Sequence, residues 1–188
     1  IQGDFIKARD DFTSALELNP KLASALNSRG FVNHKLDSLQ LALEDFNASI
    51  EIKHDSPMAF FNRGNILKDI SRLDEAMTDY ERVLQLSPNF APAYNNRGTI
   101  KRIRGDYRGA LRDFNIAIRL DTKFQGAYYN RGNIFKEMRQ FDQAAKDLSI
   151  AIAINPNDAN AYNARGNVFK ELYRPEKAID DFGKAIAL

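Results

Sequence analysis

Apolar residues recur along the chain at steps of three and four residues. One such group comprises Ala161, Tyr162, Gly166, Val168, Phe169 and Leu172, and the next comprises Ala178, Ile179, Phe182, Ala185 and Ile186. This spacing places each group on one side of an α-helix, whereas a half-buried strand would alternate apolar and polar residues. The pattern therefore predicts pairs of helices of roughly 13 residues each, joined by turns.

The same pattern repeats with a fixed period. An Arg-Gly pair occurs five times at a spacing of 34 residues, at Arg29-Gly30, Arg63-Gly64, Arg97-Gly98, Arg131-Gly132 and Arg165-Gly166. A constant period of this length is typical of two-helix units stacked side by side, each of which buries its apolar face against its neighbours.

Other columns recur in phase with the Arg-Gly pair. A large apolar residue precedes it at Leu26, Phe60, Tyr94, Tyr128 and Tyr162, and a small residue follows it at Ala42, Ala76, Ala110, Ala144 and Ala178. These columns, with Pro20, Pro88 and Pro156 between units, resemble the tetratricopeptide repeat over essentially the whole chain. The resemblance implies an all-α fold, an α-solenoid in which antiparallel helix pairs form a right-handed superhelix.

The period also predicts the domain organisation, a single array over residues 1–188. Residues 1–22 supply a partial repeat with only a second helix, full repeats occupy 23–56, 57–90, 91–124 and 125–158, and a last repeat at 159–188 lacks its final turn. We therefore expect the sequence to be an excerpt from a longer protein.

One polar pair recurs in every repeat that has both helices. Its members are Arg29 and Asp45, Arg63 and Asp79, Arg97 and Asp113, Arg131 and Asp147, and Arg165 and Asp181. We predict that each Arg of a first helix reaches an Asp of a neighbouring second helix, giving a ladder of partly buried, charge-assisted hydrogen bonds. Because the pair is built into every repeat, a structural role is favoured over a chemical one.

Another set of polar residues lies opposite the apolar columns of the first helices, at 100° per residue. In the family that the repeats resemble, this strip lines the concave groove. Its members here are Phe61, Asn62, Asn65, Lys68, Asn95, Asn96, Arg102, Tyr129, Asn130, Asn133, Lys136, Asn163, Asn167 and Lys170. Asparagines thus follow one another along the strip, beside a basic row made of His34, Lys68, Arg102, Lys136 and Lys170.

The asparagines are candidates for binding a peptide. A carboxamide both donates and accepts hydrogen bonds, so a column of them can bind the backbone of an extended segment whatever its side chains. The column resembles that in the repeat region of O-GlcNAc transferases, through residues 94–98 and 128–133. Alternatively, the asparagines bridge adjacent first helices or keep the surface solvated, and Phe61 and Tyr129 pack against the next helix instead of anchoring a ligand.

Composition gives no support for catalysis. The chain has no Cys, so disulfides and thiolate metal sites are excluded while the compartment stays open. The two histidines, His34 and His54, fall in different elements without other ligands at metal-binding spacing. We therefore predict a protein that is not an enzyme and has no metal or cofactor.

Charge and apolar content bear on the partners. The net charge of +2 is too small to indicate nucleic acid or a membrane, and no apolar run is long enough to cross a bilayer. Residues 91–124, however, hold eight Lys or Arg against three Asp or Glu. An acidic segment of a partner could therefore meet Lys101, Arg102 and Lys136.

The leading hypothesis is a noncatalytic scaffold that holds an extended peptide segment of a partner protein in its groove. One alternative is the recruitment arm of a larger enzyme, such as a glycosyltransferase, and a weaker one is nucleic-acid binding through the basic residues 97–112. Self-association is a separate prediction, because apolar surface is expected to be open at both ends, near Phe5, Phe12, Ile186 and Leu188.

Overall fold

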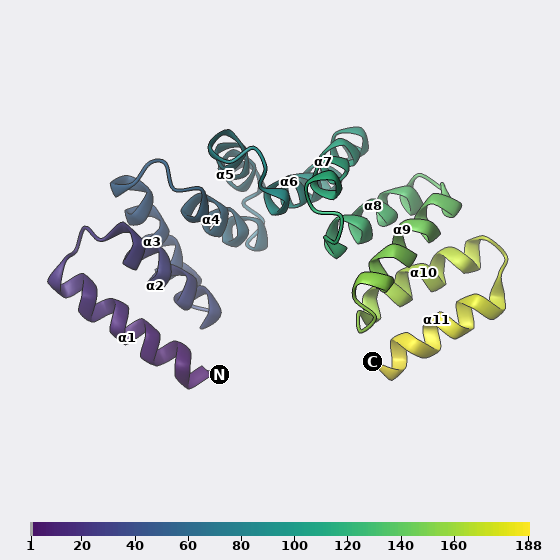
Figure 1. Ribbon diagram of the computed structural model, residues 1–188, viewed down its shortest axis with the longest axis horizontal. Coiled ribbons are helices and arrows are strands. Elements are labelled where there is room, and N and C mark those ends of the chain that lie inside the picture. The colour runs from purple at the N-terminus through teal and green to yellow at the C-terminus, as the bar shows by residue number, and fades with distance from the viewer. Residues whose placement is uncertain (1) are drawn as a thin grey trace. The chain divides into compact units, whose positions relative to one another are not determined.

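The computed structural model describes residues 2–188, which form eleven α-helices and, within that range, no strand. The helices are α1 (Gln2–Leu18), α2 (Ala23–Lys35), α3 (Leu39–Ile52), α4 (Pro57–Asp69), α5 (Leu73–Leu86), α6 (Ala91–Ile103), α7 (Tyr107–Leu120), α8 (Gln125–Glu137), α9 (Phe141–Ile154), α10 (Ala159–Glu171) and α11 (Pro175–Ala187). Even-numbered helices are the first helices of the repeats and odd-numbered ones the second helices. The predicted all-α fold of paired helices is confirmed (Figure 1).

The chain divides into two compact units, one up to Ala93 and the other from Tyr94 to Leu188. In the first unit, α2 contacts α1, α3 and α4, and α5 contacts α4. In the second, α8 contacts α7, α9 and α10, and α11 contacts α10. Consecutive first helices thus touch directly within each unit, which is why a column on the first helices can act across repeats.

Close approach within each helix pair depends on the glycine of the Arg-Gly pair. A methyl group added at Gly98 would lie 2.8 Å from Cε1 of Phe114, and one added at Gly166 would lie 2.7 Å from Cε1 of Phe182. Ordinary van der Waals contact between carbon atoms is about 3.5–4.0 Å. The side chain beside the Asp column, an aromatic ring in four repeats and Leu148 in the other, therefore occupies the space that a larger residue would need.

The turn inside each repeat has the same backbone form five times. The second residue after the end of the first helix is left-handed at Asp37, Ser71, Gly105, Arg139 and Tyr173, with φ between 54° and 78°. At Arg139 the backbone N–H bonds to the carbonyl of Lys136, and that of Gln140 bonds to the carbonyl of Phe135. This is a Schellman motif, and glycine, its preferred residue, occurs at only one of the five positions.

The two ends differ in how open they are. Ile186 and Leu188 are 86% and 57% exposed, as expected for an uncovered second helix. Phe12, in contrast, packs against the buried cluster of Leu16, Ala25 and Leu26, and Phe5 is half-buried. The expectation of an open apolar face is therefore wrong for Phe12, because α2 covers that side of α1.

Candidate functional site

The recurring Arg and Asp side chains meet within each repeat, between its first and second helix. Each guanidinium donates through Nε and Nη2 to the two carboxylate oxygens, at 2.8 and 2.6 Å between Arg63 and Asp79. The equivalent pairs are Arg29–Asp45, Arg97–Asp113, Arg131–Asp147 and Arg165–Asp181. All five aspartates are at most 4% exposed. A buried carboxylate of this kind is held in place by its paired cation.

The arginines also reach the preceding repeat, which the sequence did not indicate. Nη1 of Arg63 donates to Oδ1 of Asn47 at 2.8 Å, and Nη1 of Arg131 donates to Oδ1 of Asn115 at 2.6 Å. Each acceptor lies two residues after an Asp of the ladder. Ser149, two residues after Asp147, accepts a hydrogen bond from Nη1 of Arg165 in the same way. One arginine therefore joins three helices. The column holds Thr13, Asn47, Glu81, Asn115, Ser149 and Gly183, so its composition gave no consistent signal.

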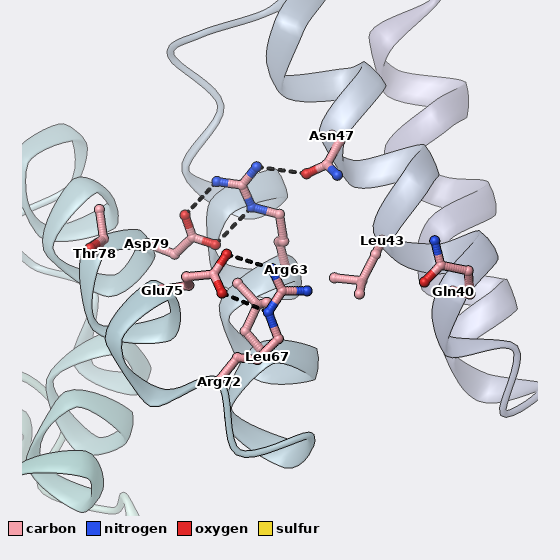
Figure 2. A pocket seen from close by; sticks show the side chains of 9 residues that line it. All are labelled: Gln40, Leu43, Asn47, Arg63, Leu67, Arg72, Glu75, Thr78 and Asp79. Carbon is pink, nitrogen blue, oxygen red and sulfur yellow. Dashed lines mark hydrogen bonds and ion pairs between the residues drawn. The ribbon is translucent and has the colours of Figure 1, made fainter.

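A pocket of about 340 Å³ lies beside one rung of the ladder, between α3, α4 and α5 (Figure 2). In this pocket Arg63 bridges Asp79 and Asn47. Arg72 makes a second bidentate pair with Glu75, to which its Nε and Nη2 each donate at 2.6 Å. Every charged side chain that lines the pocket thus has a partner within it. The pocket supplies no unpaired charge to a ligand.

Burial and pairing shift the pKa values of the ladder in directions that agree with this structural role. Hydrogen bonds to Asp45 and Asp181 raise the pKa of Arg29 and of Arg165 above the ordinary value for arginine. Burial raises the pKa of Asp79, and the bonds from Arg63 offset only part of that effect. Transfer of the carboxylate out of water therefore remains costly even in the intact pair.

Lys101 belongs to the ladder rather than to a free basic surface. Its Nζ lies 2.8 Å from Oδ2 of Asp113, the carboxylate that also accepts from Arg97. Asn33, which occupies the same column as Lys101 two repeats earlier, donates to Asp45 at 2.9 Å in the same manner. Whether an acidic partner meets Lys101 stays a prediction, and a buried carboxylate of its own repeat already holds this side chain.

Two asparagine pairs bridge consecutive first helices. Nδ2 of Asn62 donates to Oδ1 of Asn27 at 3.3 Å, and Nδ2 of Asn130 donates to Oδ1 of Asn95 at 2.9 Å. Both pairs are 35 residues apart in sequence, one more than the repeat period. Part of the asparagine strip thus serves contact between repeats, which is one of the alternatives left open by the sequence.

The other asparagines of the strip differ in how available they are. Asn65 accepts from the hydroxyl of the buried Tyr80 at 2.8 Å, and Asn95 also donates to Asn96 at 3.1 Å. Asn133 is half-buried, and within residues 2–188 its side chain makes no hydrogen bond.

In the last repeat the strip is open. Asn163 and Asn167 are exposed, and Asn167 donates to the backbone carbonyl of Asn163 at 2.9 Å. Amide groups remain accessible mainly in the second unit.

The two aromatic members of the strip are half-buried and pack against other side chains of the protein. Phe61 lies 6.0 Å from the ring of Tyr80 and 5.0 Å from the ring of Phe90, the latter edge to face. Tyr129 packs against two buried clusters, one containing Ala164 and the other Tyr162. These contacts favour the packing alternative over ligand anchoring for both rings.

The basic row is partly neutralised. Lys68 lies 3.0 Å from Asp69, and Nη1 of Arg102 lies 2.7 Å from Oε1 of Glu137 on the next first helix. Nε of Arg102 is buried without a hydrogen-bond partner among the described residues. Lys136 is half-buried and Lys170 exposed. The row therefore offers less free positive charge than its sequence indicates.

Two other kinds of feature, a metal-binding cluster and a membrane-spanning helix, do not occur in the described part of the chain. Among residues 2–188, no cluster of three or more His, Cys, Asp or Glu side chains is arranged to hold a metal ion. No helix in that range combines the length and apolar character needed to cross a membrane.

Comparison with known proteins places the repeats. A family model described as TPR repeat matches residues 64–101 and 132–172, so these two segments are similar to tetratricopeptide repeats. A search of the curated proteins gave no match. The likeness of the asparagine column to that of O-GlcNAc transferases stays a prediction.

Several solved structures share the fold. PilW, described as a widely conserved type IV pilus biogenesis factor, has a TM-score of 0.86 at 20% identity, with 95% of this chain and 83% of that chain covered. PilF of Pseudomonas aeruginosa has a TM-score of 0.85 at 18% identity, covering 95% and 82%. YrrB, described as a TPR protein with an unusual peptide-binding site, has a TM-score of 0.71 at 21% identity, covering 94% and 91%. At these identities the likeness shows the fold alone.

Proposed function

We propose that these tetratricopeptide repeats form a noncatalytic scaffold that binds an extended segment of a partner protein along the asparagine-bearing side of the first helices. The fold is that of protein–protein interaction scaffolds, whose stacked helices create long binding surfaces. YrrB, with the same fold, is described as having a peptide-binding site. This analogy supports the class of function, and the choice of surface rests on the side chains.

The observation that carries the proposal is the state of the amides on α8 and α10. The carbonyl oxygen of Asn130 makes no bond within residues 2–188 although its amide nitrogen is fixed by Asn95. The side chain of Asn133 has no partner in that range, and that of Asn163 is exposed. Donors and acceptors held this way match the alternating N–H and C=O groups of an extended backbone.

The bridging bonds strengthen this interpretation. A side chain already fixed by one bond loses less rotamer freedom when it binds a ligand, so less of the binding free energy is spent on ordering it. Asn130 is fixed in this sense by Asn95 in the second unit, and Asn62 by Asn27 in the first.

The test uses peptides selected from a random library on the whole protein, with affinity measured by fluorescence anisotropy. Asn133→Ala removes an amide that has no bond in the folded chain, so folding should be unaffected. We expect the affinity to fall by about three- to tenfold, the loss of one hydrogen bond. Gln143→Ala, which removes an exposed amide from second helix α9, is the matched control and should leave affinity unchanged.

A second arm tests whether the backbone is what is recognised. Methylating alternate amide nitrogens of a selected peptide should abolish binding, while replacing its side chains one at a time should have small effects. If Asn133→Ala binds as tightly as the unmodified protein and Gln143→Ala binds more weakly, the peptide lies on the second-helix side and the proposed surface is wrong.

A further inference from the structure

One face of α7 carries an unusual arrangement of positive charge. Arg108, Arg112 and Arg119 are all exposed, and within the described residues none of them makes a hydrogen bond or ion pair. Their spacing of four and seven residues puts them on one side of the helix, opposite the buried Ala110 and Phe114. Unpaired arginines at such spacing form a continuous cationic stripe about 16 Å long, at 1.5 Å per residue.

No other second helix has this stripe. The residues at the three positions are Gln40, Glu44 and Glu51 on α3, Asp74, Thr78 and Gln85 on α5, Asp142, Lys146 and Ala153 on α9, and Glu176, Asp180 and Ala187 on α11. Repetition of the fold therefore does not explain the arginines, since the architecture accepts either charge or none here. On α9 the same columns carry exposed Lys146 and exposed Asp142, one charge of each sign.

The corresponding surface of the first unit is acidic. Exposed Glu44 and Glu51 lie seven residues apart on α3, which is the spacing of Arg112 and Arg119 on α7. The preceding second helix repeats the pattern with Asp10 and Glu17 on α1. In these columns the first unit has no basic residue.

We infer that the arginine stripe of α7 docks on the acidic second-helix face of α3 in another copy of this chain. Two helices with matched seven-residue spacings place Arg112 and Arg119 opposite Glu44 and Glu51, each about 10 Å apart along its own helix. Arginine suits this role because its planar guanidinium binds a carboxylate through two parallel hydrogen bonds.

Charge complementarity favours a second copy over a nucleic acid as the occupant. The chain as a whole carries a net charge of +2, so a long polyanion would be attracted by α7 and repelled by α1 and α3. Contact between α7 of one molecule and α3 of the other uses both surfaces. It leaves the first-helix side unoccupied, so it is independent of the proposed peptide binding.

Exposed ion pairs are individually weak, so the association is expected only at high protein concentration and low salt. Screening shortens the reach of the charges from about 10 Å at 0.1 M salt to about 3 Å at 1 M. Association through the apolar ends near Ile186 and Leu188 would instead persist or strengthen as salt rises. Salt dependence therefore distinguishes the two surfaces.

The experiment is sedimentation equilibrium of the unmodified chain and of two charge-reversed variants, each checked for helical content. One variant carries Arg112→Glu and Arg119→Glu, and the other carries Glu44→Arg and Glu51→Arg. We expect the unmodified chain to associate at low salt, and each variant alone to lose about tenfold or more in association constant. An equimolar mixture of the two variants should recover association, because acidic faces of one then meet basic faces of the other.

Several outcomes would overturn the inference. The unmodified chain could remain monomeric at low salt up to about millimolar concentration, the range in which weak contacts are populated. Either variant could associate as strongly as the unmodified chain, or the mixture of two folded variants could fail to associate. Binding of a DNA or RNA duplex by an otherwise monomeric chain would assign the stripe to nucleic acid instead.

Discussion

Replacing Arg63 with Met should destabilise the protein strongly, because it leaves the Asp79 carboxylate buried without its cation. Asp79 is 2% exposed, and the substitution of Arg63 removes the two hydrogen bonds of 2.8 and 2.6 Å that hold its carboxylate. Breaking a buried pair by removing one partner costs about 3–5 kcal/mol. Burial already raises the pKa of Asp79 in the intact pair, so this site accommodates an isolated negative charge poorly.

The converse change should cost less. In Asp79→Leu the guanidinium of Arg63 keeps its bond to Asn47 at 2.8 Å, and its side chain is 23% exposed, so water can hydrate it. We expect a loss of about 1–3 kcal/mol, the cost of leaving a polar group with incomplete bonding. The double variant Arg63→Met/Asp79→Leu should recover most of the stability, since replacing a buried ion pair by apolar residues is often neutral or stabilising.

The pH dependence gives an independent check. Without Arg63, whose bonds lower the pKa of Asp79, the folded-state pKa rises further above the ordinary value, while the unfolded-state pKa does not change. Between the two values the folded chain binds the proton and the unfolded chain does not, so stability falls as pH rises through this window. The deficit of Arg63→Met relative to the unmodified chain should therefore be smaller near pH 4 than at pH 7, since ordinary carboxyl groups titrate at about 4.

Urea unfolding followed by far-ultraviolet circular dichroism measures all three variants, and their coupling energy follows from the double-mutant cycle. Arg72→Met, which breaks only the exposed pair with Glu75, is the control and should have no resolvable effect. If the losses of Arg63→Met and Asp79→Leu simply add in the double variant, or if the deficit does not change with pH, the ladder does not stabilise the repeats as described.

Three further predictions concern packing and backbone geometry, and the same unfolding assay checks each. Gly98→Ala should destabilise by about 1–3 kcal/mol through overlap with Phe114, and no loss would mean that the ring can move aside. Arg139→Gly should stabilise by roughly 0.5–1 kcal/mol by relieving the left-handed backbone at φ 60°, and a loss of stability would contradict this account of the turn. Leu84→Ala should cost about 2–5 kcal/mol at 9% exposure, whereas Ile186→Ala, in the same column at 86% exposure, should cost less than about 0.5 kcal/mol. Equal losses at the two sites would show that the end of α11 is covered in solution.

The repeat pattern could be predicted from the sequence because it involves many positions in phase. Helical spacing fixes which residues share a face, and the constant period fixes which residues of different repeats are equivalent. The pairing of Arg63 with Asp79 followed from the same reasoning, since a polar pair present in every repeat has few other places to go. The contacts of the five pairs in the structure agree with that expectation.

The candidate site was predicted less completely. The sequence indicated that asparagines share one side of the first helices, but it did not show that Asn62 and Asn130 already bond to the preceding first helix. It also did not assign Lys101 to Asp113 or Asn47 to Arg63. Each of these contacts depends on where two packed helices place their side chains relative to one another, which a period of 34 residues does not encode.

By itself, therefore, the sequence determined the kind of repeat, its phase, the faces of each helix and the Arg–Asp pairing within one repeat, because these depend on local periodicity. Tertiary structure decided which polar groups remain available to a ligand, because availability depends on side chains from neighbouring repeats that satisfy them first. Asn133 and Asn130 occupy the same face of α8, yet only the fold shows that one is unbonded and the other is held by Asn95. The same holds for α7, where the arginines stay unpaired only because no acidic side chain of the second unit reaches them.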